Sequence, residues 1–292
     1  MTQPSGTEAR DVSIQPEFLS LDGLRIRYAR GPRGGRDGAS TAGPETVLLL
    51  SPWPESLYAF WPMWTRLTQQ FSLIAVDLPG FGQSQGRPDL MTPRAMGEFV
   101  TRLVAELAPG PVHAVGPDVG TGALLAAAAA HPESFKSLVV GAGAATYPLR
   151  VSGVLKDFID APSLDPFRQI DPADVVHQVA GAIRNYAMPD FVLDDYLASY
   201  AGARYIESVP YVRSYPAELA ALAPLLADLR TPVQIIVGRD DPYGLADDAE
   251  VLNRELPDSR LDVLNTGHCA WEEDPARYAS ITADWINRAA MP

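Results

Sequence analysis

The hydrophobic residues of this chain gather in short, continuous runs that alternate with amphipathic stretches. A short apolar run bounded by polar or turn-forming residues is typical of a parallel strand that is covered on both faces. Strands that alternate with helices predict an α/β fold with a doubly wound, mostly parallel sheet. The strands predicted in this way cover residues 47–50, 73–76, 138–140, 233–237 and 260–264, together with a short strand that begins at residue 112.

Two segments near the start of the chain alternate apolar and polar residues instead. Residues 17–21 and 24–29 have the period-two pattern of half-buried strands, and the pair Asp22-Gly23 between them favours a tight turn. This combination predicts a β-hairpin. Residues 1–16 form a polar lead, and residues 31–44 are rich in Gly, Arg, Ser and Ala, which predicts a surface loop.

Residues 145–226 interrupt the alternation of strands and helices. The segment is rich in Tyr, Asp and Pro, and it carries helical patterns at residues 172–186 and 190–200. Ligands of open α/β sheets bind at the carboxyl ends of the strands, and we expect the segment to cover that edge as a helical cap. The predicted organisation is therefore a core in two parts, residues 17–144 and 227–290, with the cap inserted between them.

Composition limits the partners that the chain can have. A formal net charge of -13 over 292 residues repels nucleic-acid backbones and anionic membranes. The one cysteine, Cys269, excludes an internal disulfide and a thiolate metal cluster. The first residues are polar and no apolar run has membrane-spanning length, so we expect a cytoplasmic protein. We further expect a monomer or a homodimer that acts on a small molecule without a cofactor or a metal.

The segment from residue 112 to residue 122 carries the first candidate for chemistry. A buried strand ends in a turn that holds Asp118, flanked by Gly116 and Gly120, and an Ala-rich helix follows. Small neighbours at this spacing allow a strained turn to expose one side chain, as in a nucleophile elbow. A carboxylate is anionic at neutral pH and can attack an electrophilic carbon without a general base. The alternative is that Asp118 only caps the helix.

The loop that follows residues 47–50 predicts an oxyanion hole. Pro52 and Pro54 have no N–H group, so Trp53 carries the isolated backbone donor between them. One aimed donor on a rigid turn, together with the N–H of Val119 after the elbow, can stabilise an oxyanion. The alternative is an ordinary proline-rich turn.

A literal G-x-S-x-G motif at residues 82–86 offers Ser84 as a rival nucleophile. No strand is predicted to end at Gly82, and Pro88 and Pro93 delay the next helix. The strand-turn-helix context of an elbow is missing, so Ser84 is not expected to be catalytic.

Two later loops, each leaving a predicted strand, supply an acid and a base. The first carries the acidic pair Asp240-Asp241, and the second carries His268. Of the four histidines, His268 is the one expected at the carboxyl edge of the sheet. A histidine there can activate water, and an acid from the neighbouring loop can fix its tautomer. The order acid, acid, histidine along the chain matches a catalytic triad whose nucleophile is Asp118.

Together these motifs resemble those of the α/β-hydrolase superfamily over residues 17–290, and within it the aspartate-nucleophile branch of epoxide hydrolases and dehalogenases. Residues 54–58, Pro-Glu-Ser-Leu-Tyr, resemble a stretch common in epoxide hydrolases. Residues 77–82, Asp-Leu-Pro-Gly-Phe-Gly, and residues 238–241, Gly-Arg-Asp-Asp, recur across the superfamily.

The resemblance implies roles for individual residues. It places the triad acid at Asp241, and it implies that two cap tyrosines protonate the opening epoxide, for which Tyr186 and Tyr211 are the candidates. The chain departs from the family pattern in two places. Ser51-Pro52 stands where the family has His-Gly, and Val119 stands where haloalkane dehalogenases place a tryptophan.

The expected function is that of an epoxide hydrolase-like enzyme. It would open an epoxide on a small, apolar or aromatic substrate through an aspartyl-ester intermediate. One alternative is a dehalogenase that uses the same triad. The other is a non-hydrolytic enzyme of a natural-product pathway, or a ligand-binding protein, built on the same fold.

Overall fold

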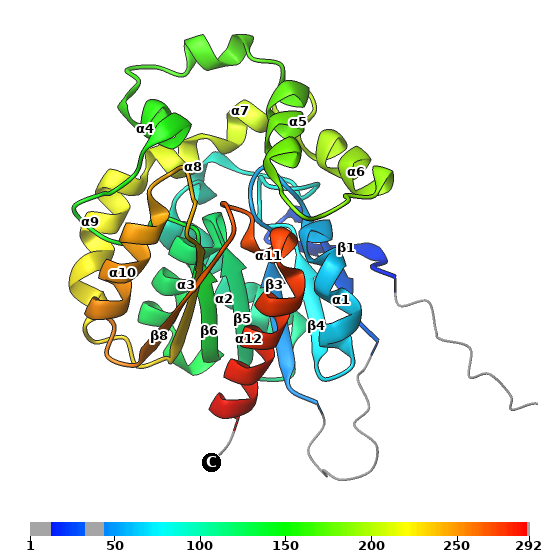
Figure 1. The fold of residues 1–292 in the computed structure, drawn as a ribbon, viewed down its shortest axis with the longest axis vertical. Coiled ribbons are helices and arrows are strands. Elements are labelled where there is room, and N and C mark those ends of the chain that lie inside the picture. The colour runs from blue at the N-terminus through cyan, green and yellow to red at the C-terminus, as the bar shows by residue number, and fades with distance from the viewer. Residues whose placement is uncertain (1–12, 33–43, 291–292) are drawn as a thin grey trace, which may run out of the picture.

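An eight-stranded sheet forms the centre of the computed structural model, which describes residues 13–32 and 44–290 (Figure 1). The strand order is β1-β2-β4-β3-β5-β6-β7-β8. The strands from β4 to β8 pair in parallel, whereas β2 pairs antiparallel with both β1 and β4, so the predicted hairpin and mostly parallel sheet are confirmed. The strands are β1 (Pro16–Leu21), β2 (Leu24–Arg30), β3 (Thr46–Leu50), β4 (Ser72–Val76), β5 (Val112–Pro117), β6 (Phe135–Gly141), β7 (Val233–Gly238) and β8 (Ser259–Leu264).

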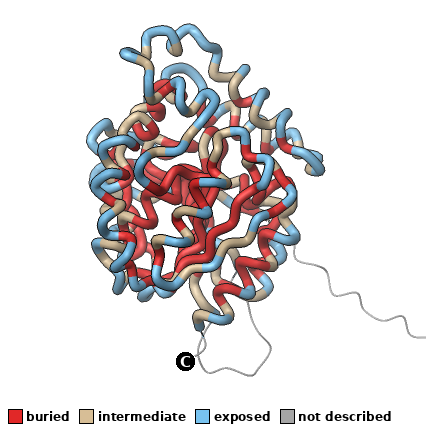
Figure 2. The backbone as a smooth tube through the Cα atoms, turned by 60° about the vertical axis from the view of Figure 1, so that its left-hand side comes forward, coloured by how far each residue is buried: buried red, intermediate tan, exposed pale blue. Residues whose placement is uncertain are grey.

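Helices cover both faces of this sheet. Every residue of β5 and β7 is buried, as the continuous apolar runs predict for strands in the middle of a parallel sheet. Figure 2 shows the same burial along the central backbone. Helix α3 packs against β5 and β6 and against α2, while α12 packs against β6 and β7 and against α1. The core helices are α1 (Trp61–Thr68), α2 (Pro93–Leu107), α3 (Val119–Ala130), α10 (Leu245–Glu255), α11 (Ala270–Glu273) and α12 (Pro275–Ala289).

Six further helices, which we call the cap helices, lie between β6 and β7 in sequence. The first four sit above the carboxyl ends of the parallel strands, and α9 runs beside α3 (Figure 1). The helix predicted for residues 172–186 ends at Ala182, and Asn185 has a φ of 62°, which an α-helix does not allow. The cap helices are α4 (Gly153–Asp160), α5 (Pro172–Ala182), α6 (Asp190–Tyr200), α7 (Arg204–Ser208), α8 (Pro210–Arg213) and α9 (Tyr215–Leu226).

Two sequence predictions fall largely on residues outside the described ranges. These are the polar lead, of which residues 1–12 are not described, and the surface loop, of which residues 33–43 are not described. Within the described part of the chain, no helix has both the length and the apolar character needed to cross a membrane.

A buried ion-pair network fastens α6 to the core. Arg27 of β2 donates to the two carboxylate oxygens of Asp195 at 3.0 and 2.6 Å. The same guanidinium lies 3.4 Å from Asp77, in the loop after β4. Asp195 also accepts hydrogen bonds from Ser56 Oγ at 2.6 Å and from Gln83 Nε2 at 3.0 Å. Since a buried charge without a partner is costly, this network fixes the position of α6 on the sheet.

Replacing Asp195 with alanine should destabilise the protein by about 3 kcal/mol, because Arg27 then keeps a buried charge with a weaker set of partners. Asp194, its exposed neighbour on α6, is the matched control. Asp194→Ala should change the free energy of unfolding by less than about 0.5 kcal/mol. Urea unfolding of the two variants measures both values. Equal losses would show that the network does not hold the cap.

Candidate active site

Asp118 occupies a strained turn between β5 and α3. Its φ of 53° and ψ of -121° are rare for a residue with a side chain, and its N–H donates to the carbonyl of Gly141 at 2.9 Å. The turn needs close backbone neighbours, because a Cβ added at Gly143 would lie 2.0 Å from the Asp118 carbonyl oxygen. The Asp118 side chain makes no capping hydrogen bond to α3. The helix-cap interpretation is therefore wrong, and the geometry is that of an elbow.

The carboxylate of Asp118 faces the loop predicted to form the oxyanion hole. The N–H of Trp53 donates to Asp118 Oδ2 at 2.6 Å. Burial raises the pKa of Asp118 to about 6, while the charge of His268 and the N–H groups of Trp53 and Val119 act in the opposite direction. Asp118 is therefore mostly anionic at neutral pH. Of the two predicted donors, the N–H of Trp53 donates to this carboxylate, and the N–H of Val119 lies near enough to stabilise its charge.

His268 lies between two acids in loops that leave β5 and β7. Its Nδ1 is 2.8 Å from Asp241 Oδ2, and its Nε2 is 3.8 Å from Asp118 Oδ1. Asp241 also accepts from the N–H of Tyr243 at 2.8 Å. Asp240 points away from the site and pairs with Arg184 at 3.1 Å. The structure thus brings Asp118, Asp241 and His268 together in the arrangement that the sequence predicted.

Two negative charges keep the imidazole of His268 protonated in this resting arrangement. Burial on its own lowers the pKa of His268, but the hydrogen bond to Asp241 and the charges of Asp241 and Asp118 outweigh it and raise that pKa to about 9. At 3.8 Å, opposite charges attract by roughly 4 kcal/mol at an effective dielectric constant of about 20. Asp118 and His268 therefore form an ion pair at neutral pH. Loss of the Asp118 charge would lower the pKa of His268 and favour the neutral ring, which can accept a proton.

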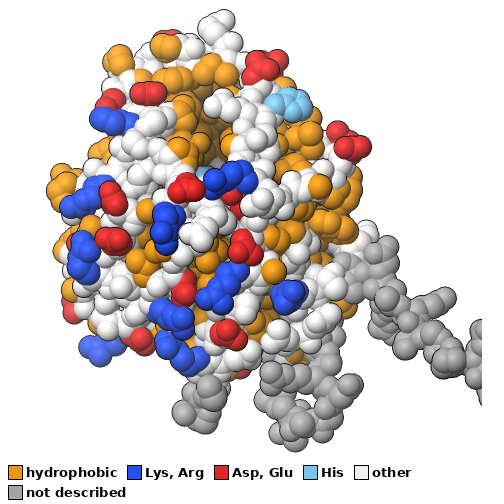
Figure 3. Space-filling view, viewed as in Figure 1, with side chains coloured by type: hydrophobic (Ala, Val, Ile, Leu, Met, Phe, Trp, Pro, Cys, Tyr) orange, Lys and Arg blue, Asp and Glu red, His pale blue; other side chains and the backbone are white. Residues whose placement is uncertain are grey.

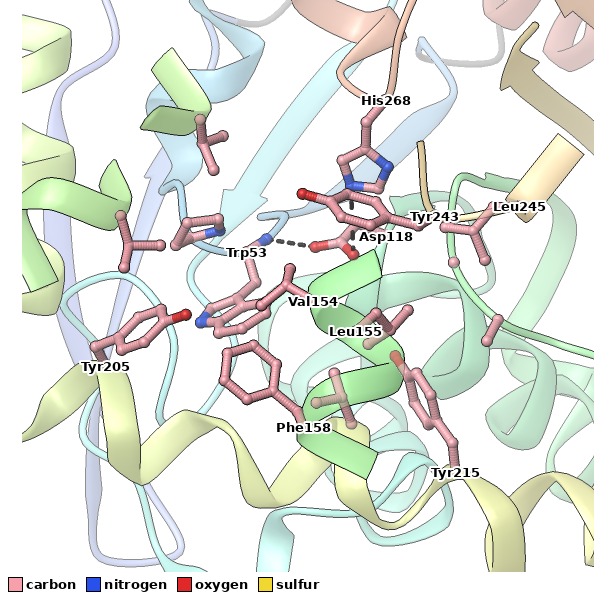
Figure 4. Close-up of a pocket in the computed structure, with 16 residues that line it drawn as sticks. Trp53, Asp118, Val154, Leu155, Phe158, Tyr205, Tyr215, Tyr243, Leu245 and His268 are labelled. Carbon is pink, nitrogen blue, oxygen red and sulfur yellow. Dashed lines mark hydrogen bonds and ion pairs between the residues drawn. The ribbon is translucent and has the colours of Figure 1, made fainter. Parts of the chain in front are cut away.

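Asp118 and His268 line an apolar cavity whose wall also includes residues of the cap helices (Figure 4). Its wall includes Trp53, whose indole stacks on the Tyr205 ring with centroids 5.3 Å apart, and Phe158 of α4. A second cavity shares His268 and Phe158 with the first and continues past Arg184. Figure 3 shows a hollow with hydrophobic walls on this face of the molecule. We call the first of these cavities the inner cavity. Among the described residues that line it there is no lysine or arginine.

The two predicted cap proton donors lie elsewhere. Tyr211 is fully buried and donates its hydroxyl to the carbonyl of Val119 at 2.8 Å, and Tyr186 has a buried hydroxyl without a hydrogen-bond partner in the described part of the chain. Neither lines the inner cavity. Tyr205, Tyr215 and Tyr243 do line it. Tyr243 belongs to the core loop two residues after Asp241, so a search of the cap sequence could not find it.

Figure 4 shows the ring of Tyr243 beside Asp118 and His268, and Tyr215 farther along the cavity wall, near Leu155. Burial raises the pKa of both phenols, and the charge of Asp118 adds to the effect at each. Both hydroxyls are thus protonated donors at neutral pH. Tyr205 lies farther along the cavity, stacked on Trp53.

Ser84 has a structural role, as the sequence context indicated. The side chain is fully buried, and its Oγ donates to the carbonyl of Asp77 at 2.6 Å and accepts from the N–H of Arg27 at 2.8 Å. The first contact lies within the loop after β4, and the second fastens that loop to β2, away from the cavity.

The pKa of His268 tests the assignment of the two acids. Asp241→Asn and Asp118→Asn should each lower that pKa by roughly one to three units, because each removes a negative charge beside the ring. Asp240→Asn is the control and should leave it unchanged, since Asp240 faces Arg184. Proton NMR titration of the ring measures all three. A drop in the Asp240 variant alone would transfer the role of acid to that residue.

Comparison with known proteins agrees with this fold. A family profile described as the alpha/beta hydrolase fold matches residues 45–275. Over 187 residues the chain is 29% identical to the dihydrolipoyllysine-residue acetyltransferase component of the acetoin cleaving system from Cupriavidus necator. That match covers 62% of this chain and 46% of the relative, so the chain spans less than half the length of that protein.

Solved structures superpose over nearly the whole chain. The structure of Cfl2 from Burkholderia cenocepacia has a TM-score of 0.78 at 21% identity and covers 95% of this chain and 97% of its own. The epoxide hydrolase VrEH1 from Vigna radiata has a TM-score of 0.74 at 16% identity and covers 94% and 98%. Likeness at these identities shows the fold, whereas the family profile covers well over half of the chain. The chain therefore belongs to the α/β-hydrolase family.

Proposed function

We propose that this α/β hydrolase opens an epoxide through an ester of Asp118. The observation that carries the proposal is the ionised elbow carboxylate, which faces a histidine at 3.8 Å that is itself held by a second acid. A carboxylate nucleophile suits attack on a saturated carbon, because the alkyl ester that forms has a carbonyl carbon that water can attack afterwards. Histidine then serves as the base for water in the second step.

The first step joins the Asp118 oxygen to an epoxide carbon and breaks the carbon–oxygen bond of the ring. The oxygen that leaves takes a proton from a phenol, for which Tyr215 and Tyr243 are placed on the cavity wall. Because the ester carries no charge, the electrostatic attraction that kept His268 protonated weakens. The first step therefore favours loss of the His268 proton and prepares the ring to act as a base.

The second step hydrolyses the ester. His268 Nε2 takes a proton from water, and the hydroxide attacks the Asp118 ester carbonyl. The resulting oxyanion accepts from the N–H groups of Trp53 and Val119, and the resting hydrogen bond from Trp53 to Asp118 supports this role. Collapse of the intermediate expels the diol oxygen, which regains a proton from the imidazolium, while the tyrosine is reprotonated from solvent. Asp118 leaves this step as a neutral acid and gives its proton to His268, in place of the one that the ring released to solvent after the first step. The product is a vicinal diol, and the resting ion pair is restored.

The lining of the cavity favours an uncharged substrate. The acids Asp118 and Asp241 give the site a negative potential, and the described side chains of the inner wall supply no basic group to bind a carboxylate or a phosphate. Apolar contacts come from Trp53, Phe158 and Leu155. These features support a neutral, apolar or aromatic epoxide and disfavour haloacids.

Hydrolysis of a neutral carbon–halogen bond is the second candidate, and one observation favours it. The indole N–H of Trp53 is buried at the cavity and has no acceptor within the described ranges. Such a donor can bind a departing halide. The leading candidate remains the epoxide, because Tyr215 and Tyr243 line the same cavity as Asp118 and can supply a proton, which a departing halide does not need.

His268→Gln should trap the ester, because water in the second step then lacks its base. We expect mass spectrometry of the Asp118 peptide to show an adduct of the whole epoxide after incubation with neutral epoxides. An organohalide substrate would instead add the alkyl group and release halide. The double variant Asp118→Asn, His268→Gln is the control and should stay unmodified. An unmodified His268→Gln peptide across a broad panel of both substrate classes would contradict the mechanism.

Tyr215→Phe and Tyr243→Phe should each slow ester formation, and loss of general acid catalysis corresponds to about 10²–10⁴-fold. Tyr186→Phe and Tyr211→Phe are the comparison variants and should slow it far less, because these hydroxyls do not line the cavity. Single-turnover measurement of adduct formation in the His268→Gln background gives the four rates. Larger losses at Tyr186 or Tyr211 would return the role of proton donor to them.

A further inference from the structure

Two acidic side chains beside the active site are buried without a basic partner. Glu55 lies in the oxyanion loop, two residues after Trp53, and Glu272 lies in α11, four residues after His268. Their exposed fractions are 1% and 0%. No arginine or lysine of the described chain bonds to either carboxyl, since Arg184 pairs with Glu273 and Asp240 instead. Two ionised carboxylates in such a place would be strongly unfavourable.

Hydrogen-bond donors account for three of the four carboxyl oxygens. Cys269 Sγ donates to Glu55 Oε1 at 3.2 Å, and Trp271 Nε1 donates to Glu55 Oε2 at 2.9 Å. Tyr196 of α6 donates its hydroxyl to Glu272 Oε1 at 3.0 Å. The fourth oxygen, Glu272 Oε2, is buried and has no partner in the described ranges. It is the one oxygen of the pair that lacks a donor.

A proton on Glu272 Oε2 accounts both for two buried acids without a cation and for the one oxygen that has no donor. One oxygen of each carboxyl lies within 4.8 Å of the other, and the two groups are placed for a hydrogen bond in which a protonated Glu272 donates to Glu55. Protonation removes one of the two buried charges and supplies a hydrogen to the oxygen that had no partner. The donors Trp271, Cys269 and Tyr196 are compatible with this state, because a carboxylate and an acid carbonyl both accept hydrogen bonds.

We propose that Glu272 is a neutral carboxylic acid that donates its proton to an ionised Glu55, so that the pair joins the oxyanion loop to α11 and α6. In this arrangement Glu272 is a positioning residue that acts through Glu55. Glu55 in turn sets the place of the loop that carries the Trp53 N–H. The proposal does not depend on which substrate the enzyme hydrolyses.

The electrostatic surroundings agree with one proton and one charge. Burial raises the pKa of both carboxyls. The charge of Glu55 raises the pKa of Glu272 further, and the charge of Asp118 raises that of Glu55. The other titratable groups that face the pair are Tyr186, Tyr196, Cys269, Glu273, His268 and Asp118. Of these, only the imidazolium of His268 is positive. It interacts with Glu55 by electrostatic attraction rather than by a hydrogen bond.

The division of charge gives the two acids different effects on His268. Glu55→Gln removes a negative charge and should lower the pKa of His268, whereas Glu272→Gln replaces one neutral donor with another and should leave it unchanged. Proton NMR titration of the ring distinguishes these outcomes. An equal fall in both variants would show that Glu272 is ionised and would overturn the proposal. A merely structural role would not separate them.

Infrared spectroscopy detects the proton directly. Near pH 7.5, the wild-type protein should show the carbonyl band of a buried carboxylic acid that is absent from the Glu272→Gln variant. Glu273→Gln, at the neighbouring acid that pairs with Arg184, is the matched control and should keep the band. Asp118→Asn should also keep it. Absence of the band from the wild-type protein, or a stoichiometric metal ion found at the pair by elemental analysis, would overturn the proposal even if the variant fails to fold.

The pH dependence of the free energy of unfolding is a third test of the proposal. An unfolded glutamate loses its proton near its ordinary pKa of 4.5, whereas the folded protein keeps the proton on Glu272. Unfolding therefore releases this proton, and stability falls as pH rises toward the folded-state pKa. Between about pH 5.5 and 7.5, one such proton corresponds to about tenfold in the unfolding equilibrium constant per pH unit. Glu272→Gln should remove a slope of that size, and an unchanged slope would contradict the assignment.

Discussion

The need to keep a carboxylate ionised beneath a cap governs this structure. Asp118 lies buried at an apolar cavity, and burial raises its pKa to about 6. His268 and the N–H of Trp53 oppose that effect from two sides, so the nucleophile remains an anion at neutral pH. Without them the carboxyl group would take up a proton and lose its nucleophilic oxygen.

Elsewhere the protein handles its buried acids in other ways. Asp77 forms an ion pair with the Arg27 guanidinium and accepts hydrogen bonds from two backbone N–H groups. Burial still raises its pKa to about 6. Glu55 and Glu272 lie together without a cation, which is the basis for assigning them a shared proton. A positive partner, a set of N–H donors and a retained proton are three physical answers to the same cost of desolvation. All three occur beside the loop from Ser51 to Ser56.

The sequence predicted those parts of the fold and site that follow from local pattern. Continuous apolar runs indicate the buried strands, and the glycines on either side of Asp118 indicate the elbow. The acid and histidine could be placed because each follows a strand of a parallel sheet, and the carboxyl ends of such strands share one edge. Asp241 rather than Asp240 came from family resemblance, and the 2.8 Å contact with His268 agrees with it.

What the sequence could not predict depends on packing between distant segments. Tyr211 and Tyr215 are one helical turn apart, yet the hydroxyl of Tyr211 bonds to Val119 while Tyr215 lines the cavity. The Glu55–Glu272 pair joins residues more than 200 positions apart, and no local pattern marks it. Ion pairs between a core strand and the cap, such as Arg27 with Asp195, are hidden for the same reason.

The loop from Ser51 to Ser56 has a consequence for the order in which the enzyme becomes competent. Trp53 is tied to the elbow, Glu55 to the segment after His268, and Ser56 to α6 of the cap. Three widely separated stretches of polypeptide thus meet on six residues. The N–H of Trp53 is held toward Asp118 by a loop that depends on all three contacts, so under the proposed mechanism a partly assembled chain would lack its aimed oxyanion donor.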